Sequence, residues 1–137
     1  MRIYSQVMKK NSVSLMATPL VWLRLEGLLL LFTGVIVYRS LGGPWWGLLL
    51  GFLADLSFTA HLAGPRTGAL IYNLLHALVL PVALGLLGYA SGLPLAVLIS
   101  LVWTAHIGLD RLFGYGLKYP DSFGHTHLTP ASPDPAP

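Results

Sequence analysis

The sequence predicts an all-α integral membrane protein, a bundle of four transmembrane helices with antiparallel neighbours and short loops rich in Gly and Pro. Hydrophobic residues make up 55% of the 137 residues and charged residues only 9%, whereas about 25% of a typical soluble domain is charged. The apolar residues also gather in four runs of about 20 residues, each long enough to cross a bilayer. This composition excludes a disordered protein, and the absence of cysteine excludes a disulfide scaffold.

Four spans are expected within a membrane domain of residues 18–118, at about 19–38, 44–62, 67–89 and 94–117. Residues 1–17 are polar and lack the apolar core of a signal peptide, so we expect the first run to be retained as a span. Residues 119–137 form a cytoplasmic tail whose Pro-rich end is expected to be disordered. Gly and Pro residues stand between the runs, where each helix must stop and the next must start.

Tryptophan and cationic residues indicate how the spans sit in the membrane. We interpret the tryptophans as interface anchors, with Trp45 and Trp46 opening the second span. Every Lys and Arg except Arg39 lies on the side of the termini, so the positive-inside rule predicts cytoplasmic N and C termini in the cell (inner) membrane. The net charge of +3 is attributed to this bias and to contact with membrane lipids, and no nucleic-acid partner is expected.

The extracellular half of the spans is almost entirely apolar. It offers little polar lining beyond Thr33 and Ser100, which argues against a permeation path and favours a pocket open to one side. Glycines at Gly85, Gly88 and Gly92 would let two helices approach closely, so a homo-oligomer is a further expectation.

Ionisable residues at membrane depth are the most informative feature of the sequence. A rise of about 1.5 Å per residue puts five of them about 10–18 Å from the cytoplasmic helix ends: Glu26, Asp55, His76, His106 and Asp110. A charge near the bilayer centre costs about 2.5–3.5 kcal/mol on insertion scales, so each one needs a reason. Residues of all four spans are therefore predicted to meet at one level in the cytoplasmic half.

Local spacing predicts shared helix faces for several of these side chains. His106 and Asp110 are four residues apart, so they lie one above the other on the fourth span. Tyr72 and Asn73 precede His76 by four and three residues and share its face, which makes both candidates for substrate binding.

The second span shows the same kind of α-helical spacing. Asp55 and Thr59 would share one face with Leu62. His61 would point away from that face and towards the interface, where a structural role is expected.

Two imidazoles and two carboxylates are predicted to form a metal site. Such a nitrogen and oxygen set suits zinc, manganese or iron, whereas magnesium and calcium prefer oxygen alone. The four expected ligands are Asp55, His76, His106 and Asp110. Glu26 would be a fifth ligand or the general base for a metal-bound water. The first functional hypothesis is therefore a metal-dependent hydrolase with its site in the cytoplasmic half of the bundle.

Two other interpretations of the same side chains remain open. They could form a structural hydrogen-bond network between helices, worth about 0.6–2 kcal/mol for each bond, in a non-enzymatic membrane scaffold. They could also line a proton or ion path in a small carrier. A carrier would need a continuous wet path across the bundle.

The cytoplasmic end of the fourth span carries cations and is followed by histidines. Arg111 and Lys118 would hold the phosphate of a lipid-like or phosphorylated small-molecule substrate. The alternative is that they complement the helix dipole and the anionic leaflet. His125 and His127 are near enough to fold back over the cytoplasmic mouth of the bundle as extra ligands.

The same residues resemble a bacterial integral membrane family, the domain-of-unknown-function family numbered 4260. The likeness covers roughly residues 20–128 and implies a four-helix membrane protein, without a function. The matching motifs are Leu23-Arg24-Leu25-Glu26-Gly27, Asp55-Leu56-Ser57, Ala63-Gly64-Pro65-Arg66-Thr67-Gly68-Ala69, Tyr72-Asn73-Leu74-Leu75-His76, Ala105-His106-Ile107-Gly108-Leu109-Asp110-Arg111, Gly114-Tyr115-Gly116-Leu117-Lys118-Tyr119-Pro120 and Thr126-His127-Leu128.

The chain is also similar, more weakly, to membrane-bound metal-dependent hydrolases of the LexA-binding type. Those proteins carry an Asp after a Pro, a paired His segment, and a late His-x-x-x-Asp, an order that Asp55, His76 and His106 with Asp110 follow. Ala54 stands where that pattern has Pro, and Tyr72 stands where it has the first His of the pair. The resemblance implies metal-dependent hydrolysis with one nitrogen ligand fewer.

Overall fold

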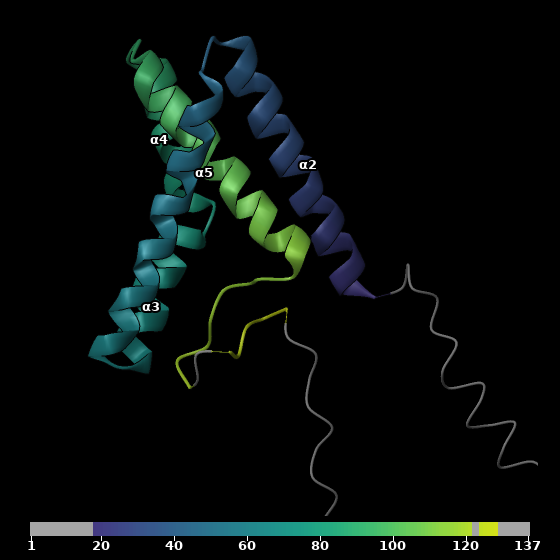
Figure 1. Cartoon of the computed structure of the whole chain (residues 1–137), viewed down its shortest axis with the longest axis vertical. Coiled ribbons are helices and arrows are strands. Elements are labelled where there is room, and N and C mark those ends of the chain that lie inside the picture. Colours follow the sequence, from purple (N-terminus) through teal and green to yellow (C-terminus); the bar gives the residue numbers. More distant parts are fainter. Residues whose placement is uncertain (1–17, 122–123, 129–137) are drawn as a thin grey trace, which may run out of the picture.

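The structure, a computed structural model, is an all-helical bundle (Figure 1) and describes residues 18–121 and 124–128. The helices are α2 (Pro19–Ser40), the 3₁₀ helix η2 (Trp45–Ala63), α3 (Pro65–His76), α4 (Val79–Ala90) and α5 (Pro94–Phe113). Four segments are long and apolar enough to cross a membrane, with α3 and α4 together forming one of them. The predicted fold class is therefore confirmed. The expectations for residues 1–17 and for the end of the tail lie outside the described residues.

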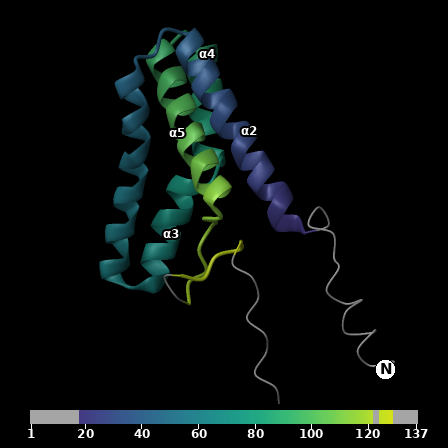
Figure 2. The ribbon, with the colours of Figure 1, turned by 45° about the vertical axis from the view of Figure 1, so that its right-hand side comes forward.

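The helices run up and down between two ends of the bundle. We call the end that contains Pro19, Pro65 and Phe113 the proximal end, and the end that contains the loops at 41–44 and 91–93 the distal end (Figure 1). Helix α5 packs against α2, α4 and η2, while α3 packs against η2. Figure 2 shows α2 and η2 on opposite sides of α5. Helix α2 is thus separated from the helix that follows it in sequence.

Small residues bring α2 and α5 into close contact. A Cβ atom added at Gly108 would lie 2.5 Å from the backbone nitrogen of Leu31 and 2.7 Å from the carbonyl oxygen of Gly27. One added at Gly34 would lie 2.9 Å from the Cβ of Ala105. Gly27 and Gly34 are seven residues apart, so they share one face of α2. Close backbone approach of this kind is how helices associate within membranes.

Two glycines of α4 allow this helix to pack closely against α5 of the same chain. A Cβ atom at Gly88 would lie 2.7 Å from the Cβ of Ala96, and one at Gly85 would lie 2.6 Å from the hydroxyl of Ser100. Both glycines therefore pack against α5 and do not face a second copy of the chain, whereas a Cβ atom at Gly92 would meet nothing within 4 Å. A homo-oligomer formed through another surface stays a prediction.

The third span is interrupted, where the sequence predicted one helix over residues 67–89. Ala77 is extended (φ −87°, ψ 143°), so α3 ends at His76 and α4 begins at Val79. Pro81 explains the break, because proline has no N–H to bond the carbonyl four residues earlier and its ring clashes with it. The freed carbonyl of Leu75 accepts a hydrogen bond of 2.6 Å from the indole of Trp103. Trp103 is therefore an internal hydrogen-bond donor, and its interpretation as an interface anchor is wrong.

The second span is a 3₁₀ helix over its whole length. Such a helix rises about 2.0 Å per residue with three residues per turn. The winding puts Phe52, Asp55 and Phe58 on one face, three residues apart. Thr59 instead donates from its hydroxyl to the carbonyl of Leu56 at 2.7 Å. The predicted shared face of Asp55, Thr59 and Leu62 is wrong, because it assumed an α-helical period, whereas three residues per turn put Thr59 and Leu62 about 120° away from Asp55.

Helix α5 ends at Phe113, four residues before the expected boundary. Gly114 adopts a left-handed conformation (φ 91°) that L side chains rarely take. The backbone N–H of Tyr115 then donates to the carbonyl of Asp110 at 2.8 Å, which closes the helix end. Residues 115–121 and 124–128 turn back beneath the proximal end of the bundle (Figure 2).

Candidate metal centre

Four ionisable side chains from three helices meet inside the proximal half of the bundle. Each offers one ligand atom, and these atoms all lie within 4.8 Å of one another. We call this set the His/Asp cluster; it consists of Asp55 of η2, His76 of α3, and His106 and Asp110 of α5. They are the four metal ligands expected from the sequence.

The end of α3 orients His76 towards the cluster. The ring Nδ1 of His76 lies 3.0 Å from the carbonyl oxygen of Tyr72, to which it donates when it carries the proton. That hydrogen bond leaves Nε2 of a neutral ring as an acceptor, 3.4 Å from Oδ1 of Asp55. The Tyr72 ring stacks on the imidazole with centroids 3.9 Å apart and fixes its plane. A second bond of this type is usual for histidines that bind metals.

The distances within the cluster suit a shared cation better than direct hydrogen bonds. The Nε2 atoms of His76 and His106 each lie 3.4 Å from Oδ1 of Asp55. They lie 3.5 and 3.6 Å from Oδ2 of Asp110. Charge-assisted N–H···O bonds are shorter, about 2.7–2.9 Å. Four ligands at about 2.1 Å from a tetrahedral zinc ion are about 3.4 Å apart.

Several polar atoms of the cluster have no hydrogen bond. Among the described residues this holds for both ring nitrogens of His106 and for Oδ2 of Asp110, all of them buried. Buried polar groups almost always have a partner, and an unmade bond costs about 1–3 kcal/mol. A metal ion would supply the missing partner for His106 Nε2 and for the Asp110 oxygen.

The charge of the cluster also favours a cation. Asp55 and Asp110 place two carboxylates close together inside an apolar bundle, where unpaired charges are costly. Two neutral imidazoles do not offset them, whereas one divalent ion brings the formal charge of the set to zero. An aromatic shell surrounds the cluster, since Phe52 packs edge-on against His106 with ring centroids 5.3 Å apart. Phe58 likewise stacks on Tyr72 at 5.3 Å.

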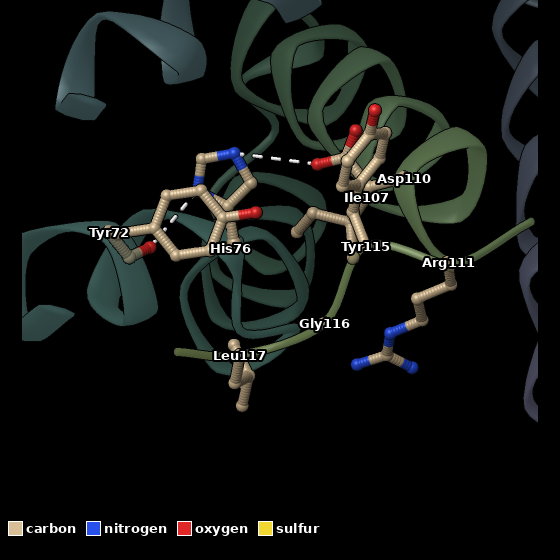
Figure 3. A pocket seen from close by; sticks show the side chains of 8 residues that line it. All are labelled: Tyr72, His76, Ile107, Asp110, Arg111, Tyr115, Gly116 and Leu117. Carbon is tan, nitrogen blue, oxygen red and sulfur yellow. Dashed lines mark hydrogen bonds and ion pairs between the residues drawn. The ribbon is translucent and has the colours of Figure 1, made fainter. Parts of the chain in front are cut away.

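A small cavity lies beside the cluster (Figure 3). It has a volume of about 10 Å³ and is lined by Tyr72, His76, Asp110, Tyr115 and neighbouring residues. That volume is about the least that holds one water molecule. Arg111 also lines it, but Figure 3 shows the guanidinium pointing away from His76 and Asp110. The cluster thus has room for one small extra ligand on the Asp110 side.

A comparison with protein families matches residues 20–130 to a family described as Domain of unknown function (DUF4260). The chain belongs to the DUF4260 family. No curated protein and no solved structure matches it. The weaker likeness to metal-dependent hydrolases gains no support from these comparisons. Because the family description names no activity, the functional argument depends on the geometry of the site.

Glu26 does not join the cluster in this DUF4260 protein. It is exposed on α2, which lies across α5 from η2 (Figure 2). Helix α2 turns Gly27 towards α5, and a residue next to it in sequence points about 100° away. The depth of Glu26 along α2 therefore did not predict whether it joins the cluster, because depth does not tell on which face of the helix a residue lies.

The described part of the tail of the DUF4260 chain, up to residue 121 and from 124 to 128, folds over the proximal end of the bundle. Asn73 holds it with two hydrogen bonds, donating to the carbonyl of Lys118 at 2.9 Å and accepting from its backbone N–H at 2.7 Å. Lys118 pairs with Thr126 in an antiparallel bridge. The Nδ1 atom of His127 accepts a bond from the N–H of Leu117, and His127 is not part of the His/Asp cluster. His125 is exposed and pairs with Asp121, also outside the cluster.

The Lys118 side chain is buried above the cluster rather than reaching into solvent. It is 7% exposed, and its ammonium lies 4.8 Å from the ring centroids of both Phe58 and Tyr72. Burial lowers the pKa of this ammonium below its ordinary value. The Tyr72 ring thus contacts both this ammonium and the imidazole of His76.

Phe52, Phe58 and Trp103 are functional neighbours that the sequence reasoning missed. The two phenylalanines stand three residues before and after Asp55, a spacing that identifies them once η2 is known to be a 3₁₀ helix. Trp103 precedes His106 by three residues and bonds the carbonyl next to His76. Its position well inside the fourth span was the feature of the sequence that indicated a role away from the membrane interface.

Replacing Asn73 by alanine is expected to release the tail. The change removes the two hydrogen bonds between Asn73 and the backbone of Lys118 at once, at a cost of about 1–3 kcal/mol. Hydrogen exchange and limited proteolysis at residues 116–128 should become faster. Thr59→Ala is the matched control, because its hydroxyl bonds only within η2. Unchanged exchange in Asn73→Ala would show that these bonds do not hold the tail.

Proposed function

We propose that this DUF4260 protein is a membrane-embedded, metal-dependent hydrolase whose ion is held by the His/Asp cluster. The observation that carries the proposal is the set of four His–Asp distances of 3.4–3.6 Å, two of whose ligand atoms, His106 Nε2 and Asp110 Oδ2, are buried without a hydrogen bond. Two imidazole nitrogens and two carboxylate oxygens suit zinc, manganese or iron.

The access to the cluster supports catalysis rather than a purely structural ion. The two histidine side chains are each 3% exposed, whereas Asp55 is 34% and Asp110 is 18% exposed. One side of the cluster is therefore sealed and the carboxylate side is open, next to the water-sized cavity. A bound divalent ion acidifies a coordinated water and polarises a substrate oxygen.

The chain's own groups supply the remaining steps of an ester hydrolysis. The second carboxylate oxygen of Asp110, beside the cavity, accepts the proton of the attacking water, the role expected for Glu26. The water oxygen bonds to the ester carbon or phosphorus, the bond to the leaving alcohol breaks, and the proton passes to that alcohol. Lys118 contributes positive charge on the proximal side of the cluster and favours an anionic substrate.

The proposed location is the cell membrane, with the proximal end facing the cytoplasm. Arg24, Arg66, Arg111 and Lys118 belong to the proximal half, while Arg39 stands next to the distal loop. This distribution follows the positive-inside rule. The polar group that is hydrolysed in the proximal half of the bundle would then lie nearer the cytoplasmic face of the membrane.

Chelation and reloading of the purified protein test this function. Hydrolysis of p-nitrophenyl carboxylic and phosphoric esters should fall at least about 100-fold after chelation and return with zinc, manganese or iron. Asp121→Asn is a matched control, since Asp121 is an exposed carboxylate that pairs with His125 outside the cluster. Hydrolysis of neither ester class by the metal-loaded protein would contradict the proposal.

A further inference from the structure

An apolar groove runs through the distal half of the bundle, and its inner end is lined by residues that adjoin the His/Asp cluster. It has a volume of about 550 Å³, within the range of about 300–1,000 Å³ for small-molecule sites. Its walls are the stretch from Trp46 to Ala54 on η2 and the stretch from Leu95 to Trp103 on α5. Tyr38 stands at its distal end and Leu75 at its inner end.

The side chains that line the groove are almost entirely apolar. No charged side chain lies among the described residues that line it. The Tyr38 hydroxyl donates to the carbonyl of Pro44 at 3.0 Å, and the Trp103 indole donates to the carbonyl of Leu75. Both of these polar groups are thus already bonded to backbone. The groove therefore suits a hydrocarbon chain and gives no anchor to a polar head group.

The dimensions of the groove match one chain in one leaflet. The eight residue steps from Trp46 to Ala54 span about 16 Å at the 3₁₀ rise, and the eight steps from Leu95 to Trp103 span about 12 Å at the α-helical rise. Half of a hydrocarbon core is about 15 Å thick. Leu50 and Ile99 in its walls are about half exposed, at 51% and 46%, so a chain can enter from the bilayer.

The inner end of the groove is lined by residues whose backbone adjoins three of the four cluster residues. Ala54 precedes Asp55, and Leu75 precedes His76. A Cβ atom built on Gly51 would lie 3.0 Å from the Cβ of His106. A chain that fills the groove would therefore bring the group at its inner end to the His/Asp cluster.

We infer that the groove holds the single long hydrocarbon chain of the substrate, with the hydrolysable polar group at the cluster. The substrate class is then an ester of a long-chain fatty acid or alcohol, an assignment that rests on the proposed function. The cation at the distal end does not compete for the head group, because Arg39 donates to the carbonyl of Gly43 and lies 4.4 Å over the Trp45 ring.

Two photoreactive palmitic acids test the site and the direction of the chain. One carries a diazirine near the carboxyl group and the other near the methyl end, and cross-linked peptides are identified by mass spectrometry. The carboxyl-side probe should label the inner end around Ala54 and Leu75, and the methyl-side probe should label the distal end around Trp46 and Leu95. Reversed labelling, or equal labelling of lipid-facing residues on α2 and α4, would overturn the inference.

A groove-filling variant separates a specific site from general lipid contact. Leu98→Trp should lower labelling about tenfold or more, because the indole would occupy space that the chain needs. Leu87→Trp, at a 67% exposed position on α4 outside the groove, is the control and should label like the wild type. Equal labelling of the two variants would overturn the chain site.

Metal content measured on the same samples keeps the two proposals apart. Groove labelling in the expected direction without bound metal would support the chain site and remove the hydrolase assignment. Bound metal with labelling spread outside the groove would remove the chain site and leave the metal centre standing.

Discussion

The His76→Ala, His106→Ala double variant is expected to retain less than about one tenth of the transition metal that the wild type binds. Loss of an outer-sphere partner alone costs about 10–100-fold in metal affinity, so loss of two direct ligands must cost more. Mass spectrometry of metal content on detergent-purified protein measures the difference. The wild type should carry about one zinc, manganese or iron ion per chain after reloading.

The same variant should lose metal-dependent stabilisation. An ion that binds only the folded state stabilises it by about 2.7 kcal/mol at 100 times its dissociation constant. We therefore expect added zinc to raise the Tm of the wild type and to leave that of the double variant unchanged. His125→Ala is the matched control, because His125 is an exposed histidine outside the cluster. Its metal content and its response to zinc should equal those of the wild type.

A wild type without metal after reloading would refute the metal centre. The buried histidines and aspartates would then have to share protons in a structural network, as in a non-enzymatic scaffold. In that case the double variant should have a lower Tm than the wild type, and added ions should change neither value. A search for binding partners would then replace the search for substrates.

Gly108→Leu is expected to separate α2 from α5 and to lower the Tm sharply. The new Cβ atom alone would lie 2.5 Å from the Leu31 nitrogen and 2.7 Å from the Gly27 oxygen. Both are backbone atoms, which cannot rotate away, so the helices must move apart. The expected cost exceeds the about 1–3 kcal/mol of ordinary overpacking.

Ala83→Leu is the control for this substitution, because it adds a similar side chain at an exposed position of α4. Its Tm should stay close to that of the wild type. Gly108 also stands between His106 and Asp110 on α5, so Gly108→Leu should lower the metal content as well. An unchanged Tm would show that α2 does not depend on this crossing.

The spans were predictable because they depend on composition and length alone. An apolar run of about 20 residues must cross the bilayer as a helix that satisfies its own backbone hydrogen bonds. Two details inside the spans were not predictable on the same basis. Pro81 breaks the third span at Ala77, although membrane helices tolerate proline without breaking, and the second span winds as a 3₁₀ helix.

In the candidate site, too, contacts within one helix were predictable from spacing, whereas contacts between helices depended on how the helices pack. His106 and Asp110 share a face through their spacing on one helix, so their proximity was predictable. Asp55 and His76 were expected at the same depth, and the structure places both beside them. Glu26 was expected at that depth too, but α2 lies across α5 and turns Gly27, not Glu26, towards its neighbour.

The sequence by itself determined that this DUF4260 protein is a four-span helical bundle with costly polar side chains at one depth. Only the tertiary structure decided which of those side chains meet, because depth along a helix is a matter of counting whereas direction depends on how the helices pack. The close α2–α5 crossing, the break at Ala77 and the winding of η2 set those directions. Together they bring two imidazoles and two carboxylates to within 4.8 Å and leave an apolar groove beside them.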